Sequence, residues 1–162
     1  MWLSDRRTLL LGALALAGCG FRPVYGEGGS GQALRHAVRA ADPVSPEDFH
    51  FVAAFEEVLG RPDAPRYDLG YAITLREDGA GALQNIGTTR FQVFGTLDYT
   101  LTDAASGAQV AQGRVSADAA YSTTGTQLAG LTAAEDARRR LMRSLAERLV
   151  TRLYAVPGLS AG

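Results

Sequence analysis

Two long runs of alternating apolar and polar residues constrain the fold of this chain more than any other feature of its sequence. In residues 67–76 apolar side chains recur at every second position, at Tyr67, Leu69, Tyr71, Ile73 and Leu75. In residues 89–102 the same period places an apolar set on one face together with Gly95, namely Phe91, Val93, Leu97, Tyr99 and Leu101. Successive side chains of a strand point to opposite faces, so each run predicts a strand with one face in the core and one in water.

Weaker signals extend this pattern into an antiparallel meander. Asp78-Gly79 predicts a turn, and a weaker extended segment follows at residues 83–86. Ser106-Gly107 lies where a hairpin should reverse, and residues 110–121 predict a returning strand of small side chains. Residues 34–40 alternate loosely and predict a first strand of modest quality. The expected sheet therefore has roughly four strands.

Two segments carry the start signals and apolar stripes of helices. Ser45-Pro46, followed by two acidic residues, predicts a helix that ends at Gly60. Its expected core stripe is Phe51, Val52, Phe55, Val58 and Leu59. The capping box Thr132–Glu135 predicts the start of a closing helix that runs to about Tyr154. Its expected stripe is Ala134, Ala137, Leu141, Met142, Leu145, Ala146, Leu149, Val150 and Leu153.

These elements together predict an α+β fold. Each helix has one apolar stripe and each good strand has one apolar face, so the economical packing is a two-layer sandwich. In it, an antiparallel, roughly four-stranded sheet carries both helices on one face. The other face is left uncovered, and its Thr, Gln, Asp and Arg side chains suit water or a polar partner surface.

The N-terminus predicts an exported precursor. Arg6-Arg7 precede an apolar run at residues 9–17, which ends at Gly18, as in a secretory signal. The run is too short to span the roughly 30 Å of a bilayer's hydrocarbon core. Leu16-Ala17-Gly18-Cys19 is similar to the bacterial lipobox, so we expect Cys19 to become the acylated first residue of the mature chain. The two arginines fit a general secretory signal and also resemble a twin-arginine signal.

The mature chain is long enough for one domain with its own core. Gly26–Gly31 matches the G-x-G-x-x-G pattern, but no buried strand precedes it, so we interpret it as a flexible linker. The predicted parts are a signal peptide, an acylated N-terminus with its tether, a single α+β domain and a flexible tail, at residues 1–18, 19–31, 32–157 and 158–162.

The charge balance argues against nucleic acid as a partner. Without Asp5, Arg6 and Arg7 the mature chain has 16 acidic residues, 14 arginines and no lysine. This formal charge of −2 lacks the basic excess that nucleic-acid binding usually requires. The basic run Arg138–Arg140 lies among acidic neighbours, so it predicts a solvated helix face.

The chain shows no constellation expected of an enzyme. His36 and His50 have no cysteine or second histidine at metal-ligand spacing. Ser122 is not part of a G-x-S-x-G elbow. The carboxylate pairs Glu56-Glu57 and Glu77-Asp78 are sequence neighbours, which do not face each other across a substrate bond. We therefore expect no catalytic activity, no metal and no cofactor.

Several short motifs, spread over nearly the whole chain, are similar to those of one protein family. They are the lipobox cysteine with Gly20-Phe21-Arg22-Pro23-Val24-Tyr25-Gly26, the Pro65-Arg66-Tyr67-x-Leu69 strand entry, Thr89-Arg90, Ser122, and the Ala-x-x-Asp-Ala-Arg element at Ala133–Arg138. On these motifs the chain resembles the lipopolysaccharide-assembly lipoproteins of the LptE family, in their alphaproteobacterial form.

The resemblance implies a role without catalysis. It implies an outer-membrane lipoprotein, lipid-anchored at the periplasmic face, that partners a large LptD-like β-barrel as plug and assembly factor. In that role it helps deliver lipopolysaccharide to the outer leaflet. Gly20 lacks the aspartate that retains many lipoproteins in the inner membrane, which fits this sorting. The alternative is an auxiliary periplasmic lipoprotein of a lipid transporter, which would share the anchor and the small domain.

Lipopolysaccharide carries phosphates, which arginine binds through paired hydrogen bonds. Arginines on strands or at strand ends are therefore the candidate contacts to lipopolysaccharide or to the barrel: Arg66, Arg76, Arg90 and Arg114. We expect Arg90, at the start of the longest strand, to be the most important of them.

Overall fold

The computed structural model describes residues 29–79, 82–83, 87–123 and 125–159. The predicted signal peptide, Cys19 and most of the tether lie outside these described residues. The elements in chain order are α2 (Ser30–Leu34), β1 (Val38–Ala40), α3 (Pro46–Leu59), β2 (Tyr67–Gly79), β3 (Ala82–Leu83), β4 (Gly87–Thr88), β5 (Arg90–Asp103), β6 (Gln109–Ser122) and α4 (Gln127–Tyr154).

The main sheet has four strands in the order β1-β2-β5-β6. Strands β2 and β5 pair antiparallel along their whole length, and β6 continues the meander on the other side of β5. Strand β1 pairs parallel to β2, so the sheet is mixed rather than fully antiparallel. The reason is the connection: α3 carries the chain back between the two strands, as a parallel pair requires. The predicted α+β class is confirmed.

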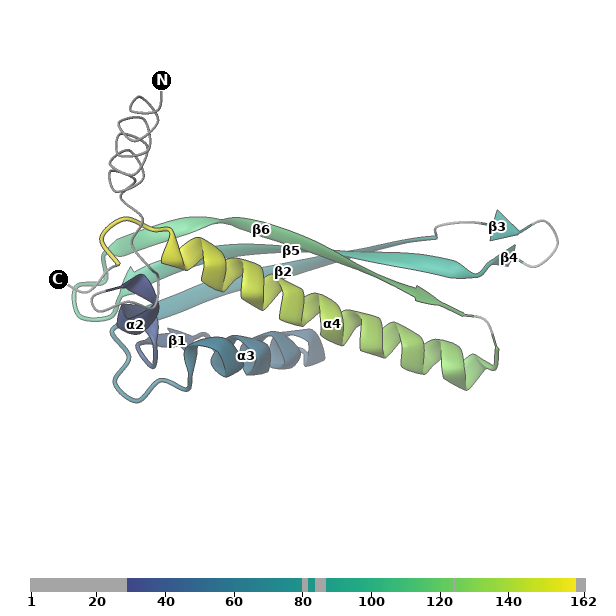
Figure 1. The fold of residues 1–162 in the computed structure, drawn as a ribbon, viewed down its shortest axis with the longest axis horizontal. Helices are drawn as coiled ribbons and strands as arrows, with labels where there is room; N and C mark the ends of the chain where they lie inside the picture. Colours follow the sequence, from purple (N-terminus) through teal and green to yellow (C-terminus); the bar gives the residue numbers. More distant parts are fainter. Residues whose placement is uncertain (1–28, 80–81, 84–86, 124, 160–162) are drawn as a thin grey trace, which may run out of the picture.

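Helices α3 and α4 pack on the same face of the sheet, as predicted (Figure 1). Helix α4 runs along nearly the whole sheet, whereas α3 covers only the part near β1 (Figure 1). The core lies between these two layers. Its largest fully buried side chains are Leu34, Phe51, Phe55, Leu59, Leu69, Leu97, Leu101, Leu141, Met142, Leu145, Leu149 and Leu153.

Helix α3 begins where the sequence predicts. The Ser45 hydroxyl accepts a hydrogen bond from the Asp48 backbone N–H, and the Asp48 carboxylate accepts one from the Ser45 N–H. This reciprocal pair satisfies two otherwise free donors of the first turn. The predicted stripe is wrong at two positions. Val58 is 40% exposed, and Ala54 is buried because it lies three residues after Phe51 and shares its face.

Helix α4 begins earlier than predicted. Its N-cap is Thr126, whose hydroxyl accepts a hydrogen bond from Ala129 N–H at 3.2 Å. The capping box proposed at Thr132 does not form, because the Thr132 hydroxyl donates to the Leu128 carbonyl inside the helix. The predicted end at Tyr154 is confirmed, and so is the stripe, except that Ala134 is only half-buried.

The first predicted strand is wrong before Val38. Leu34 closes helix α2, and His36 has a φ of 59°, a left-handed conformation that ends any extended segment. Asp78-Gly79 does not form the predicted turn either, because β2 continues through Gly79 and pairs with β5 there. The reversal at Ser106-Gly107 is confirmed, with Gly107 at a φ of 69°.

The packed part of the chain extends slightly beyond the predicted limits at residues 32 and 157. Gly31, expected in the tether, is buried within α2. Leu159, expected in the tail, is 1% exposed and belongs to the core. Among the described residues, α2 is a third helix beside the two that the sequence predicts.

Candidate binding face of the sheet

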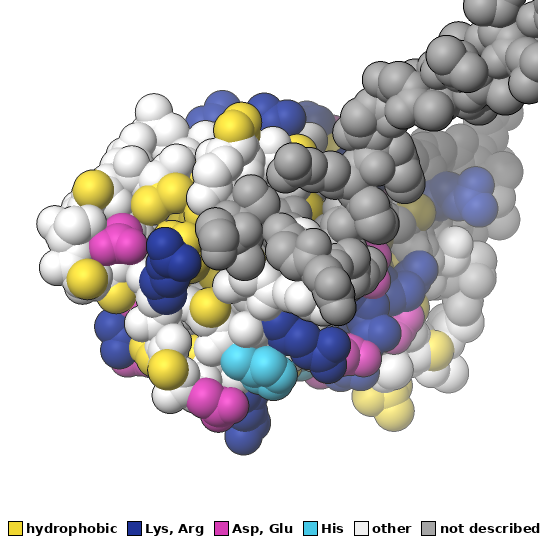
Figure 2. All heavy atoms as spheres, turned by 60° about the vertical axis from the view of Figure 1, so that its left-hand side comes forward, with side chains coloured by type: hydrophobic (Ala, Val, Ile, Leu, Met, Phe, Trp, Pro, Cys, Tyr) yellow, Lys and Arg dark blue, Asp and Glu magenta, His cyan; other side chains and the backbone are white. Residues whose placement is uncertain are grey.

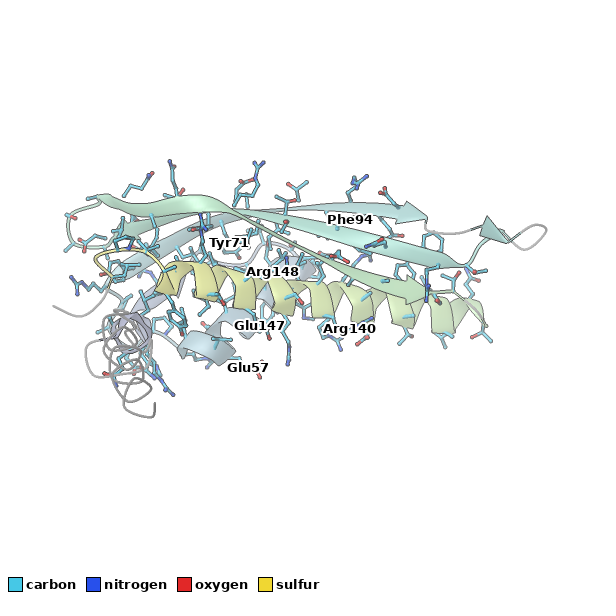
Figure 3. All side chains as sticks on the ribbon, turned by 45° about the horizontal axis from the view of Figure 1, so that its top comes forward. Glu57, Tyr71, Phe94, Arg140, Glu147 and Arg148 are labelled. Carbon is cyan, nitrogen blue, oxygen red and sulfur yellow. The ribbon has the colours of Figure 1, made fainter. Side chains whose placement is uncertain are left out.

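The face of the sheet that carries no helix is rich in charged and hydroxyl side chains. We call it the outer face. In Figure 3 its side chains stand away from the helices. The strand registers align its members in rows across β2, β5 and β6. They are Asp68, Gly70, Ala72, Thr74, Arg76, Asp78, Gln92, Phe94, Thr96, Asp98, Thr100, Thr102, Arg114, Ser116, Asp118 and Ala120.

Arg114 forms a two-point ion pair with Asp98 in the middle of the outer face. Its Nε donates to Asp98 Oδ1 at 2.6 Å and its Nη2 donates to Oδ2 at 3.0 Å. The hydrogen bond from Arg114 lowers the pKa of Asp98, and the same bond raises the pKa of Arg114. Both groups are therefore charged throughout the neutral range, and Arg114 retains donors beyond those that Asp98 occupies.

Arg76 lies between a carboxylate and an aromatic ring. Its Nη1 is 2.7 Å from Asp78 Oδ2, and its guanidinium carbon is 4.8 Å from the centroid of the Phe94 ring. The ring supplies a cation–π contact to the arginine. Phe94 is the one large apolar residue at a polar position of β5, and its contact with Arg76 accounts for an aromatic ring on this face.

Arg90 and Arg66 lie at the two ends of the sheet. Arg90 is the first residue of β5, opposite Ser122, and is exposed. It forms no ion pair with another residue that the structure describes. Arg66 directly precedes β2, and its guanidinium carbon is 5.3 Å from the centroid of the Tyr67 ring. The four predicted arginines are thus spread along the sheet rather than gathered into one pocket.

A polar cluster on the helix side of the sheet was not predicted from the sequence. Tyr121 Oη donates to Glu77 Oε1 at 2.7 Å, and Arg138 Nη2 lies 3.4 Å from Glu77 Oε2. Burial raises the pKa of Tyr121, and its hydrogen bond to Glu77 raises that pKa further. The cluster joins β2, β6 and α4. Its signal in the sequence was Glu77 itself, a carboxylate at an apolar position of the alternation.

The basic run of α4 is a solvated helix face, as predicted. Arg139 and Arg140 pair with the acidic residues four positions earlier in the helix, Glu135 and Asp136. Arg143 lies 3.4 Å from Glu57 of α3. Figure 2 shows the same mixture at the other end of the molecule, where basic, acidic and hydrophobic side chains are interspersed.

Within the described part of the chain, no group of three or more His, Cys, Asp or Glu residues is arranged to hold a metal ion. None of the described helices combines the length and the apolar character that a membrane crossing needs.

A four-stranded sheet backed by helices on one face is the fold of several small bacterial lipoproteins. A Caulobacter crescentus protein matches with a TM-score of 0.65 and 19% identity, over 80% of this chain and 96% of its own. A minor lipoprotein of Acinetobacter baumannii matches with a TM-score of 0.54 and 10% identity, over 74% and 89%. Rare lipoprotein B of Shewanella oneidensis matches with a TM-score of 0.54 and 11% identity, over 72% and 91%. At these identities the likeness shows the fold alone.

The family follows from the sequence. The model of the lipopolysaccharide-assembly family LptE matches residues 30–153, which is most of the chain. The chain therefore belongs to the LptE family. A comparison with curated proteins finds no match. The chain is thus a member of a family of lipopolysaccharide assembly.

Proposed function

We propose that this chain is an outer-membrane lipoprotein, anchored through Cys19, that partners a large LptD-like β-barrel as plug and assembly factor. In this role it helps deliver lipopolysaccharide to the outer leaflet. The observation that supports the proposal best is the outer face. The lumen of a large outer-membrane barrel is polar. A plug needs a polar exterior on the side that meets the barrel wall, and the outer face supplies one along three strands.

The dimensions of the domain also favour this role. Strands β5 and β6 have 14 residues each, and α4 has 28. At a rise of about 3.4 Å per strand residue and about 1.5 Å per helix residue, each element is roughly 40–50 Å long. The molecule is a rod, as Figure 1 shows. A rod of this length exceeds the roughly 30 Å hydrocarbon core of a bilayer, so one aligned with the barrel axis would reach through the lumen.

Arg90, at the end of the sheet where β5 begins, is the best candidate for a lipopolysaccharide contact. Arg114 is paired to Asp98 and Arg76 to Asp78, so part of the charge of each is already neutralised. Arg90 has no such pair among the described residues. Its guanidinium therefore retains its full charge and its free donors for a phosphate.

The test is lipopolysaccharide binding of the mature chain, measured for the wild type and for Arg90→Ala. The matched control is Arg152→Ala, which removes another exposed arginine, from the last turn of α4. We expect Arg90→Ala to weaken binding about tenfold, as the loss of one charge-assisted contact would, and Arg152→Ala to leave it unchanged. Equal affinities of the two variants would remove Arg90 from the proposed contact.

A further inference from the structure

One edge of the sheet is open for most of its length. Strand β1 covers only the first three residues of β2, and the last contact on this side is Ala41 N–H to the Leu69 carbonyl at 2.9 Å. Backbone groups alternate in direction along a strand, so Tyr71, Ile73 and Leu75 present their N–H and C=O groups on the same side as Leu69. No described strand pairs with β2 there.

The opposite edge of the sheet is protected. Two arginines of α4 reach over the outer strand β6 and donate to its backbone carbonyls, Arg148 to Ser116 and Arg140 to Ala120. An unpaired strand edge invites another strand to add, and natural proteins cover such edges. Side chains of α4 thus occupy two carbonyls of the β6 edge, whereas no described strand pairs with the β2 edge beyond Leu69.

A groove runs beside the open edge. It has a volume of about 740 Å³ and lies between β2 and the start of α3. Its β2 wall includes the half-buried side chains of Ile73 and Leu75. Its other wall includes Val44, which is 94% exposed, and the carboxylates of Asp42 and Glu47. The lining contains no basic residue.

The carboxylates of the groove point to a ligand with a positive charge, and an unpartnered hydroxyl points to a polar one. Asp42 and Glu47 form no ion pair with a described residue, so their charges are left for a partner. The Tyr71 hydroxyl in the same wall is buried and has no hydrogen-bond partner among the described residues. A buried hydroxyl without a partner is unfavourable, and a polar side chain of an added segment would satisfy it.

We propose that the open edge of β2 binds an extended, basic segment of another protein by strand addition. Main-chain hydrogen bonds to Tyr71, Ile73 and Leu75 would supply affinity, as in other strand-addition complexes. Apolar side chains of the added strand pack on Ile73 and Leu75, and a Lys or Arg side chain faces Asp42 and Glu47. This inference stands on the edge and the groove alone, so it does not depend on the barrel or on lipopolysaccharide.

The test uses the full mature chain and a synthetic peptide of alternating Val and Thr that carries lysines at one end. A second peptide, with glutamates in place of the lysines, is the control for charge. Amide hydrogen exchange is measured by NMR. We expect the lysine peptide to slow exchange at the amides of Tyr71, Ile73 and Leu75 by about tenfold, because these groups have no strand partner in the free chain. The glutamate peptide should leave them unchanged.

Two substitutions separate the groove from the outer face. Ile73→Lys places a charge in the groove, whereas Thr74→Lys places the same charge one residue further on the same strand, on the outer face. We expect only Ile73→Lys to abolish the protection. Equal effects of the two variants, or protection by the glutamate peptide, would overturn the proposal. Protection that grows with protein concentration without peptide would also overturn it, because it would assign the edge to a second copy of the chain.

Discussion

The contact between α4 and the centre of the sheet depends on the missing side chain of Gly95. A Cβ at this position would lie 3.0 Å from Leu145 Cδ1 and 3.2 Å from Leu141 Cδ2, closer than such atoms normally approach. Gly95→Ala should therefore cost about 1 kcal/mol of stability through overpacking of the core. The lower entropy of the unfolded chain with alanine at this position should largely offset that cost. Leu145 is fully buried, so Leu145→Ala should destabilise by about 3 kcal/mol through lost burial and a cavity.

The double variant tests whether these two groups share one space. The methyl group of alanine at position 95 fills part of the volume that Leu145→Ala vacates. It regains about 0.8 kcal/mol of burial and no longer crowds Leu145, although its contacts with Leu141 remain, so a coupling of about 1 kcal/mol is expected. The measurement is urea denaturation of the wild type, the two single variants and the double variant. The free energy of unfolding must depend on urea concentration with the same slope in all four for the comparison to hold. Additivity within about 0.5 kcal/mol would refute the close approach of α4 at Gly95.

Three further outcomes follow from single side chains. Burial, with Asp48 and Asp42 adding to it, raises the pKa of Tyr71 to about 12, so the wild type loses stability as pH rises from 10 towards 12. Tyr71→Phe should remove that loss in alkaline unfolding curves and stay within about 1 kcal/mol of the wild type at pH 7. Arg114→Ala should raise the lowered pKa of Asp98 towards its usual value in a carboxyl NMR titration. The stability that the Arg114–Asp98 ion pair contributes in the wild type is present at neutral pH and is lost as pH falls through that lowered pKa. Thr126→Ala should destabilise by about 1 kcal/mol in urea, and Thr132→Ala by less than half of that, because only Thr126 caps α4.

The strands and the long helix were predictable because the alternation of the strands and the apolar stripe of the helix are regular over many residues. Strand β5 alternates over most of its length, interrupted at Phe94, and the apolar stripe of α4 recurs from Ala137 to Leu153, so local signals agree with the packing. Cap positions were less predictable. Thr126 and the Thr132 capping box are both valid start signals, and the choice between them depends on where the preceding strand ends, which is a tertiary property.

The parallel pairing of β1 was not predictable from the pattern of that segment. The strand has three residues, and its direction follows from the α3 crossover rather than from its own side chains. The arginines of the outer face were identified by residue type and strand position, and they do lie along the sheet. Their partners were not identified, because Asp98 and Arg114 are 16 positions apart in sequence and meet only through the β5–β6 register.

The proposed role of the chain is that of a lipid-anchored partner of a large outer-membrane barrel. The most direct measurement is mild-detergent extraction of cells that produce the full chain, followed by mass spectrometry of the purified complex. We expect a mature chain that starts at a lipid-modified Cys19 and is bound to one β-barrel protein in equal amount. Recovery of a transporter in place of the barrel, or of an unmodified Cys19, would contradict it.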